Sequence, residues 1–571
     1  MLEMANDDST VHKRELTEDG KSHRTITGCI ITTIELVKMS IQRHQVQLWY
    51  SINSILGLSY SAFLIYACYR SFYDAMTLFV FTGLTLMYLL YTIIRDKTGA
   101  CLVPVIQLIN KYQTVIKRFL YIILLGGLSI FIIMDTRHAR NQLISAVGFV
   151  SIIIFCFVCS KNHSKILWRQ VVWGILLQFF LGLFILRTVA GYELFQWLGS
   201  AIAYFFTFSN YGAEFVFGDN FEDHYFAFKV LPVIIYFSSV INVLYYLGVI
   251  KFCVSKLAWL LHRTMQTSAV ESFNAAGNIF IGQVETVFLI RPFLHDMTSS
   301  ELHAVLTGGF STMSGDATGV YAPLGIDPMH IISASVMSAP AALAISKLFY
   351  PEDKKTKYIT SENVNENISK SKDRNLLEAV SHGATMAISS VSMIAANLIA
   401  FIALLELLNN LLAWIGAMVG IPQLSFEQLI CSYVFMPVAF SIGVEWDDCQ
   451  VVAELIGLKI FINEFVAYVR LSEIIENGKI GEEPSISTRS EVLATYILCG
   501  FDNIASMGIM LACLSSLIPE RKSELAKIIT RSLIAGSCTC FLTACIAGTL
   551  IIMIHSSIEA LKSISHSISL G

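Results

Sequence analysis

The stretch Gly277-Asn278-Ile279-Phe280-Ile281-Gly282-Gln283-Val284-Glu285-Thr286-Val287-Phe288-Leu289-Ile290-Arg291-Pro292 decides how the rest of the chain is organised. It is apolar on both sides, contains two glycines, and carries an amide and a carboxylate, Gln283 and Glu285, at its centre. Such a segment cannot be one spanning helix, because the backbone groups freed by the break need partners that lipid lacks. An ionisable residue at such a break indicates a binding site. The alternative, a cytosolic loop with Glu285 in solvent, is disfavoured by the long apolar flanks.

The composition is that of a polytopic membrane protein. Of the 571 residues, 55% are hydrophobic and 14% are charged, whereas a soluble domain carries about a quarter charged residues. Apolar runs long enough to span a bilayer recur along the chain, so we expect an all-α fold with about eleven transmembrane helices in the lipid bilayer. The net charge of -4 argues against a nucleic-acid partner, because that kind of binding depends on neutralising phosphates.

The apolar runs divide the chain into parts with different expected roles. Clusters of Lys and Arg on alternate loops predict a cytosolic N-terminus and an extracellular C-terminus. The segment 190–228 is aromatic but interrupted, so we expect interfacial or re-entrant helices there. The expected parts are a tail at 1–46, three spans at 47–140, scaffold spans and interfacial helices at 141–260, a transport core at 261–555 and a short tail at 556–571.

A pattern repeats within the expected core. A short apolar segment with a central carboxylate, Glu285 or Glu464, is followed each time by a span with a glycine-containing polar middle, at 308–315 and at 500–506. Paired broken segments in corresponding positions are typical of secondary transporters built from inverted repeats. We therefore expect two re-entrant helical hairpins and two discontinuous helices that meet near the middle of the membrane. No nucleotide-binding loop is present, so an ion gradient or the solute gradient must supply the energy.

Several long motifs follow one another in order along the chain. They are Gly277–Pro292, Ser300–Val305 with Thr307–Phe310, Ile332–Pro340, Tyr350–Glu352, Gly443–Trp446, Asn463–Tyr468 and Cys499–Phe501. With these motifs the chain resembles the concentrative nucleoside transporter family, from about residue 141 to 555. Residues 1–140 show no comparable match and, by the resemblance, are the three extra spans of animal members.

The resemblance implies a solute site shared by the two hairpins and the second discontinuous helix. Gln283 and Glu285 match residues that contact the nucleobase, and an amide suits a base edge because it both donates and accepts. Glu464 matches a carboxylate that binds ribose hydroxyls, which it can do with charge-assisted bonds. The remaining matches are the ribose-contacting positions Asn503 and Ser506 and an aromatic that packs against the solute, Phe501, for which ordinary core packing is the alternative.

The resemblance also implies a sodium site, with Na+ as the co-transported ion. The matching positions are the side chains of Asn278 and Thr312 and the backbone carbonyls of Ile281 and Met313. Oxygen ligands at the broken ends of helices suit a small hard cation. For Asn278 the alternative role is that of a helix cap.

Three positions depart from the family pattern. Val284 and Ala505 lack hydroxyls that other members carry, which leaves purine against pyrimidine selectivity open. Asp316 stands where Ser or Thr is usual, four residues after Thr312, so the two residues would share a face of one helical segment. A carboxylate there could strengthen sodium binding, could carry a proton instead, or could simply pair with a neighbouring donor.

The sequence therefore predicts a secondary active transporter, not an enzyme, that imports nucleosides across the plasma membrane with sodium. By the resemblance it is a homotrimer. A proton-coupled symporter and a nucleoside-binding paralogue that does not transport remain as alternatives. An ion channel is disfavoured because the polar groups converge on one site per chain. An enzyme with Glu285 and Glu464 as an acid–base pair is the other alternative.

Overall fold

A computed structural model of the protein describes residues 140–221, 225–354, 373–420 and 431–551, with Tyr66 and Ser425 as single positions. All of these except Tyr66 lie in the unit Gly126–Gly571. The regular structure of the described residues is entirely helical, which confirms the all-α fold. The three spans expected between 47 and 140, apart from single positions, and both tails lie outside the described residues.

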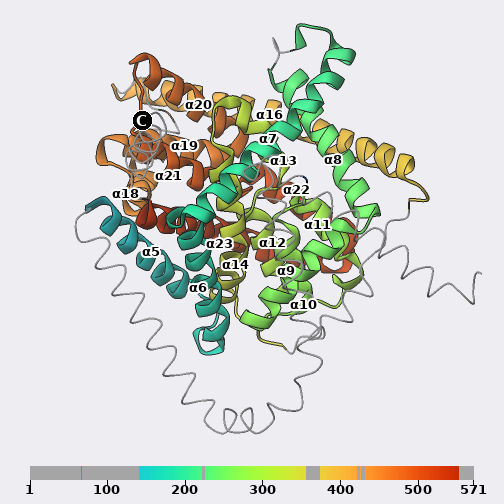
Figure 1. The fold of residues 1–571 in the computed structure, drawn as a ribbon. Coiled ribbons are helices and arrows are strands. Elements are labelled where there is room, and N and C mark those ends of the chain that lie inside the picture. The colour runs from blue at the N-terminus through green and yellow to red at the C-terminus, as the bar shows by residue number, and fades with distance from the viewer. Residues whose placement is uncertain are drawn as a thin grey trace, which may run out of the picture. The chain divides into compact units, whose positions relative to one another are not determined.

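Long buried helices form the centre of the unit. α23 contacts α5, α6, α14 and both discontinuous helices, and it runs through the middle of the bundle (Figure 1). α14 is also enclosed, because it packs against α6, α12 and α23. These central helices are α5 (Arg140–Val158), α6 (Trp168–Arg187), α14 (Pro328–Phe349) and α23 (Lys522–Leu550).

The first expected hairpin and discontinuous helix are both present. Hairpin 1 consists of α10 (Ala269–Gly277) and α11 (Gln283–Leu289), with a break at 278–282. Broken helix 1 consists of α12 (Ser299–Ser311) and α13 (Asp316–Tyr321), with a break at 312–315. Both α10 and α12 begin with a capping box, in which a Ser or Thr and a Glu satisfy the first backbone N–H groups. The helix α9 (Val249–Met265) leads into hairpin 1.

The second copy has the same order of elements. Hairpin 2 consists of α19 (Cys449–Phe461) and α20 (Glu464–Ile480), with a break at 462–463. Broken helix 2 consists of α21 (Thr488–Leu498) and α22 (Ile504–Leu517), with a break at 499–503. The sequence predicted that each copy contains a broken hairpin and a broken helix. Both interruptions are confirmed in both copies.

Each broken helix passes from one hydrophobic core to another. The core around hairpin 1 contains residues of α10, α11 and α12, and it also contains Met510 and Leu514 of α22. The core around hairpin 2 contains residues of α19, α20 and α21, and it also contains Ala317 and Tyr321 of α13. The Tyr321 ring stacks on Tyr468 with centroids 4.2 Å apart. Because each broken helix crosses from its own core to the other, its break lies between the two cores.

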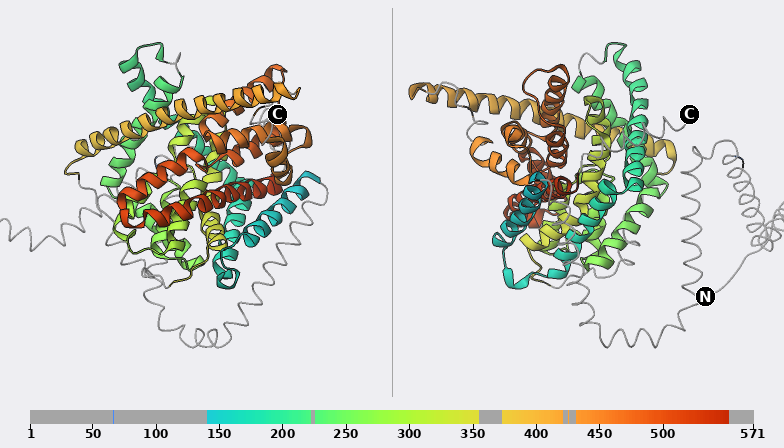
Figure 2. Two further views of the ribbon diagram at one scale, coloured as in Figure 1. Left: turned by 180° about the vertical axis from the view of Figure 1, so that it is seen from behind. Right: turned by 60° about the vertical axis from the view of Figure 1, so that its left-hand side comes forward.

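Further helices lie beside this core. α16 (Leu376–Met418) lies along α8 (Leu231–Tyr246), and the long α16 extends beyond the other described helices (Figure 2). A third helix, α18 (Met436–Ile442), packs on α5 and α19. The short 3-10 or π segments are η1 (His163–Lys165), η3 (Tyr225–Val230), η4 (Arg291–Phe293), η5 (Ala322–Leu324), η6 (Cys431–Phe435), η7 (Trp446–Asp448) and η8 (Pro519–Arg521).

The expectation that 190–228 is interrupted is wrong for most of that segment, whereas its interfacial position stays a prediction. The chain forms one continuous helix, α7 (Val189–Phe217), which begins where the Thr188 side chain accepts a hydrogen bond from the N–H of Gly191. A glycine inside a helix costs about 1 kcal/mol, and packing can offset that cost. α7 packs on α6, α8 and α14, and at Gly199 it comes close to the backbone of Met329.

Six described helices are long and apolar enough to cross a membrane. They correspond to spans expected near 142–160, 168–188, 229–250, 329–350, 384–416 and 528–555. The expected spans at 302–324 and 490–518 are the broken helices, whose halves are too short to be counted as spans separately.

Gly148 gives a test of how closely the central helices pack. A Cβ atom built on Gly148 in α5 would lie 1.8 Å from the carbonyl oxygen of Ser441 in α18. Small residues allow helices to approach closely in membranes. We predict that Gly148→Ala lowers the free energy of unfolding by about 1–3 kcal/mol, because two backbones must move apart. A thermal melt of the purified protein in detergent measures this.

Gly212→Ala is the matched control, because Gly212 in α7 has no heavy atom within 4 Å of a built Cβ. Removing a glycine from this exposed helical position should leave the melting temperature unchanged or raise it slightly. Equal melting temperatures for the two variants would contradict the close α5–α18 contact.

Candidate functional site

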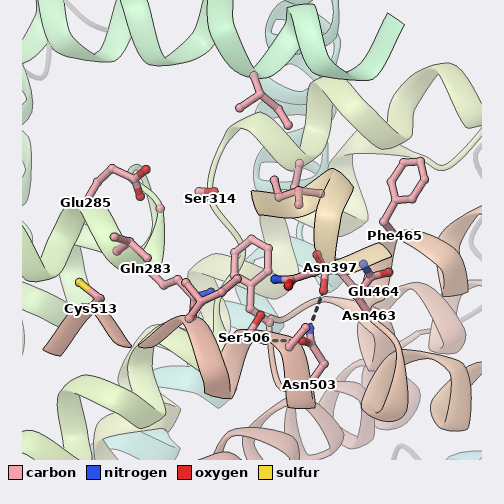
Figure 3. A pocket seen from close by; sticks show the side chains of 18 of the residues that line it. Gln283, Glu285, Ser314, Asn397, Asn463, Glu464, Phe465, Asn503, Ser506 and Cys513 are labelled. Carbon is pink, nitrogen blue, oxygen red and sulfur yellow. Dashed lines mark hydrogen bonds between the residues drawn. The ribbon is translucent and has the colours of Figure 1, made fainter. Parts of the chain in front are cut away.

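A cavity of about 590 Å³ lies where the breaks meet (Figure 3). Hairpin 1, hairpin 2 and both broken helices contribute to its wall, and so do α8 and α16. Its volume is in the range of small-molecule sites. The predicted solute-contacting residues that line it are Gln283, Glu285, Glu464, Phe501, Asn503 and Ser506.

Glu464 and Asn503 form the polar centre of one end of the cavity. The Asn503 side chain donates from Nδ2 to Oε2 of Glu464 at 2.8 Å. Its Oδ1 accepts from the backbone N–H of Ser506 at 2.7 Å and so caps α22. Glu464 is the first residue of α20, where the positive end of the helix dipole favours a carboxylate. Helix capping therefore orients Asn503, and Asn503 in turn holds Glu464 at the cavity wall.

The other end of the cavity is formed by the start of α11. In Figure 3, Gln283 and Glu285 lie at the end of the cavity opposite Glu464 and Asn503. The side-chain oxygen Oε1 of Gln283 is buried and has no hydrogen-bond partner among the described residues. The Glu285 carboxylate folds back over Gly282, where a Cβ atom would lie 2.2 Å from its Oε2. Because it is an acceptor without a partner in the cavity wall, Oε1 of Gln283 is available to a bound solute.

The apolar predictions also fall on the cavity wall. Phe501 and the two departures from the family pattern, Val284 and Ala505, all line it. Phe501 additionally packs against the core around hairpin 2, so wall and core packing are both present for this ring. The missing hydroxyls at Val284 and Ala505 thus concern the cavity itself, and their effect on base selectivity stays a prediction.

Several lining residues were missed by the sequence analysis. Asn463 caps α20 by accepting from the N–H of Val466 at 3.0 Å, and a cap signal before Glu464 could have identified it. Ser314 lies in the break of broken helix 1. Asn397 comes from α16, and nothing in the apolar pattern of that helix indicates that it reaches the cavity. Its amide makes no hydrogen bond within the described part of the chain.

The predicted ion ligands lie where hairpin 1 meets broken helix 1. Asn278 is the C-cap residue of α10 and is 2% exposed, and neither side-chain atom has a hydrogen-bond partner among the described residues. Its Nδ2 lies close to Gly308, where a Cβ atom would be 3.1 Å away. The Thr312 hydroxyl donates to the carbonyl of Gly308 at 2.7 Å. The Asn278 side chain and Thr312 therefore both adjoin one glycine of α12.

The two predicted carbonyl ligands are in the same breaks. Ile281 is in the break of hairpin 1, and the Met313 carbonyl in broken helix 1 accepts from the Ser335 hydroxyl at 2.7 Å. A carbonyl oxygen has a second lone pair that can still bind a cation. Asn278 does take a cap position, at the C-terminal end of α10, but its side chain makes no capping hydrogen bond within the described residues. Its role as an ion ligand stays a prediction.

The expectation that Thr312 and Asp316 share one helix face is wrong. Thr312 has extended backbone at the end of α12, and Asp316 is the first residue of α13 after the break. The four-residue spacing therefore does not place them on one helical surface. The structure describes the backbone of Asp316 but not its side chain, so its possible coupling role stays a prediction.

A buried lysine that the sequence analysis missed holds the base of hairpin 1. Lys347 of α14 is 2% exposed and lies 2.7 Å from Glu271, which also closes the capping box of α10. Its ammonium also donates to the Ser300 hydroxyl of α12 at 3.1 Å. A buried charge needs such partners. The pair therefore joins hairpin 1 and broken helix 1 to the central helix α14.

Comparison with known proteins identifies the family. A family model described as "Na+ dependent nucleoside transporter C-terminus" matches residues 330–548, and the corresponding N-terminus model matches 147–220. A model described as "Nucleoside recognition" matches 227–327. Solute carrier family 28 member 3 of Eptatretus stoutii is 45% identical over 90% of this chain and 76% of its own length. Sodium/nucleoside cotransporter 2 of Rattus norvegicus is 43% identical over 93% of this chain and 82% of its own.

Solved structures agree. CNTnw in an inward-facing substrate-bound state is 30% identical, covers 72% of this chain and 98% of its own, and superposes with a TM-score of 0.66. A CNTnw variant in an outward-facing state gives a TM-score of 0.67 at 30% identity, over 72% of this chain and 99% of its own. The fold and relatives are those of membrane transporters and not of enzymes. The chain belongs to the Na+-dependent, or concentrative, nucleoside transporter family, which confirms the resemblance.

The position of Glu464 generates a direct prediction. Glu464→Gln replaces a charged acceptor that Asn503 holds in place. Hydrogen bonds to charged groups contribute about 1.5–3 kcal/mol, so nucleoside uptake should fall at least about tenfold. Uptake of labelled uridine by cells that carry the variant at their surface measures this. Glu476→Gln, an exposed carboxylate on the same helix, is the control and should transport normally. Normal uptake by a surface-expressed Glu464→Gln would refute the assignment.

Asn397 generates a second prediction. Its amide lines the cavity from α16, so we expect it to hydrogen-bond the solute. Asn397→Ala should raise the KM for nucleosides about two- to tenfold, which corresponds to one lost hydrogen bond. The control is Asn410→Ala on the same helix, where the amide bonds Glu406 on the exposed side. An unchanged KM for Asn397→Ala would remove this residue from the site.

Proposed function

We propose that the protein imports nucleosides across the plasma membrane and couples this transport to a sodium gradient. The observation that carries the proposal is the cavity that Gln283, Glu464, Asn503 and Ser506 line, together with the buried Asn278 amide that has no hydrogen-bond partner among the described residues. Sodium/nucleoside cotransporters among the relatives support the same combination of solute and ion.

The two ends of the cavity suit the two parts of a nucleoside. Gln283 and Glu285 would contact the base, since an amide and a carboxylate offer donors and acceptors to a base edge. Glu464, held by Asn503, would accept from ribose hydroxyls. Ser506 and Phe501 line the same space and would bind the sugar and pack against the solute. This division supports a preference for ribosides over analogues without hydroxyls.

Sodium would bind between the breaks of hairpin 1 and broken helix 1. Asn278 and Thr312 would supply side-chain oxygens, and Ile281 and Met313 would supply carbonyls. Binding a cation would give the buried Asn278 amide the partner that it lacks within the described residues. Because the same elements line the solute cavity, ion and solute would stabilise one arrangement of hairpin 1, which is the basis of coupling.

The resemblance further supports a homotrimer with a cytosolic N-terminus and an extracellular C-terminus. The long α16 carries large apolar side chains on its exposed side, such as Leu407, Leu411 and Trp414, which suit contact with lipid or with another subunit. Cross-linking of the full-length protein in native membranes would give the number of subunits.

Uptake measurements at two pH values test the ion. We expect labelled uridine or inosine uptake to fall steeply when choline replaces sodium, and Asn278→Ala to weaken the dependence on sodium. The reason is that choline is too large for a site built from carbonyl and amide oxygens. Acid pH should not replace sodium.

The opposite outcome defines the proton-coupled alternative. Undiminished uptake in choline medium at acid pH, abolished by Asp316→Asn, would overturn sodium coupling. Binding of nucleoside to the purified protein without any uptake by intact cells would instead support a paralogue that does not transport. Surface labelling of each variant ensures that the rates are compared at equal expression.

A further inference from the structure

The central helix α14 carries three serines close together, and their hydroxyls bond in three different directions. The Ser333 hydroxyl donates to a carbonyl of its own helix, four residues back, at 2.6 Å, which is a common pattern for a helical serine. The Ser338 hydroxyl lies 3.0 Å from the hydroxyl of Thr543 in α23. The Ser335 hydroxyl instead donates to the carbonyl of Met313 at 2.7 Å. Ser335 therefore joins α14 to the break of broken helix 1.

The acceptor of this bond is one of the two carbonyls proposed above as sodium ligands. Thr312, which precedes Met313, has extended backbone, so the peptide groups of the break are outside the regular hydrogen bonds of a helix. A carbonyl there needs another group to fix its direction. Ser335 supplies that group from α14, which is itself enclosed by α6, α12 and α23. Both Ser335 and Met313 are buried, so the bond is shielded from solvent.

Ser335 reaches the break from a side that does not face the solute cavity. Met313 and Ser335 line a second, mostly apolar cavity of about 550 Å³, and neither residue lines the solute cavity. Ser314, which is labelled in Figure 3, lines both cavities, so the break forms part of the wall between them. A substitution at Ser335 can therefore change the break without removing a side chain that lines the solute cavity.

The same turn of α14 also contacts the break of broken helix 2. The carbonyl of Ile331, four residues before Ser335, accepts from the Cys499 thiol at 3.5 Å. The carbonyl of Cys499 accepts in turn from the Cys540 thiol of α23 at 3.2 Å, and Cys540 lies 3.8 Å from the carbonyl of Ser311. α14 and α23 therefore each hold both broken helices near their breaks. Within this arrangement, Ser335 is the side chain of α14 that bonds a proposed ion ligand.

We propose that Ser335 is a positioning residue for sodium, whose hydroxyl fixes the Met313 carbonyl in the direction from which that oxygen binds the ion. A carbonyl oxygen has two lone pairs, so the one that accepts from Ser335 leaves the other for the cation. Groups that orient the ligands of a metal ion contribute to its affinity without touching it. Ser335 acts in this way through Met313. This inference rests on the sodium site proposed above.

A bond that only satisfied a buried carbonyl would have a different consequence. Its loss would lower the stability of the protein, because a buried acceptor would be left without its donor. The sodium affinity of the molecules that remain folded would not change. Sodium activation of folded protein therefore distinguishes a positioning role from a purely structural one.

Sodium activation of labelled uridine uptake tests the proposal in the full-length protein. Wild-type protein and Ser335→Ala are reconstituted in proteoliposomes, and uptake is measured over a range of external sodium concentrations. For Ser335→Ala we expect the half-maximal sodium concentration to rise about two- to tenfold, which corresponds to the loss of one hydrogen bond. At saturating sodium the KM for uridine should match that of the wild type, because the solute contacts are intact.

Three variants serve as controls. Ser333→Ala removes a buried hydroxyl that bonds within the same helix, and it should keep the sodium activation of the wild type. Ser335→Thr keeps a hydroxyl, has the apolar cavity beside it for the added methyl group, and should also resemble the wild type. If Ser335→Ala does not fold, Ser335→Cys takes its place, because a thiol is a weaker donor and should also raise the half-maximal sodium concentration.

The outcomes separate this inference from the proposed function. An unchanged half-maximal sodium concentration in folded Ser335→Ala or Ser335→Cys would overturn the role of Ser335 and leave sodium coupling intact. An equal rise in Ser333→Ala would do the same, because it would show a general effect of α14. Uptake by the wild type that is independent of sodium would instead overturn the proposed function.

Discussion

The interruption of helices inside the membrane is the constraint on which this structure depends. Each of the four breaks frees backbone N–H and C=O groups in a medium that offers no partners. In the second copy the chain satisfies them with Asn463 and Asn503 as caps, and with Tyr468, Lys459 and Cys540 as donors to the end of α21. Several of the groups that satisfy the backbone also line or orient the cavity. Part of the binding site is therefore formed by side chains that the breaks already require in order to satisfy the backbone.

The arrangement of the cores explains why the breaks coincide. α13 belongs to the core around hairpin 2, and α22 belongs to the core around hairpin 1. Each broken helix must therefore change core at its interruption. This exchange brings the start of α11 and the start of α20 to one cavity, although they lie far apart in the sequence.

The sequence predicted the hairpins and broken helices because glycines and polar pairs inside apolar runs are local signals. It also predicted the lining positions of Gln283 and Glu464, although their roles came from the family resemblance. It missed Asn397 because the approach of α16 to the cavity depends on tertiary packing. It missed the pairing of Lys459 with Asp502 because a buried ion pair joins residues that no periodicity connects. The continuous α7 was missed because packing offsets the cost of its glycines.

Cys540 has a consequence for how this protein can change over generations. Its thiol lies 3.2 Å from the carbonyl of Cys499 in the second copy and 3.8 Å from the carbonyl of Ser311 in the first. A larger residue at this fully buried position would press on both copies at once. The sequences of the two copies of the hairpin and broken-helix unit therefore cannot change independently of each other at this point. A substitution near either break has to be compatible with the other half, or be accompanied by a compensating change in α23.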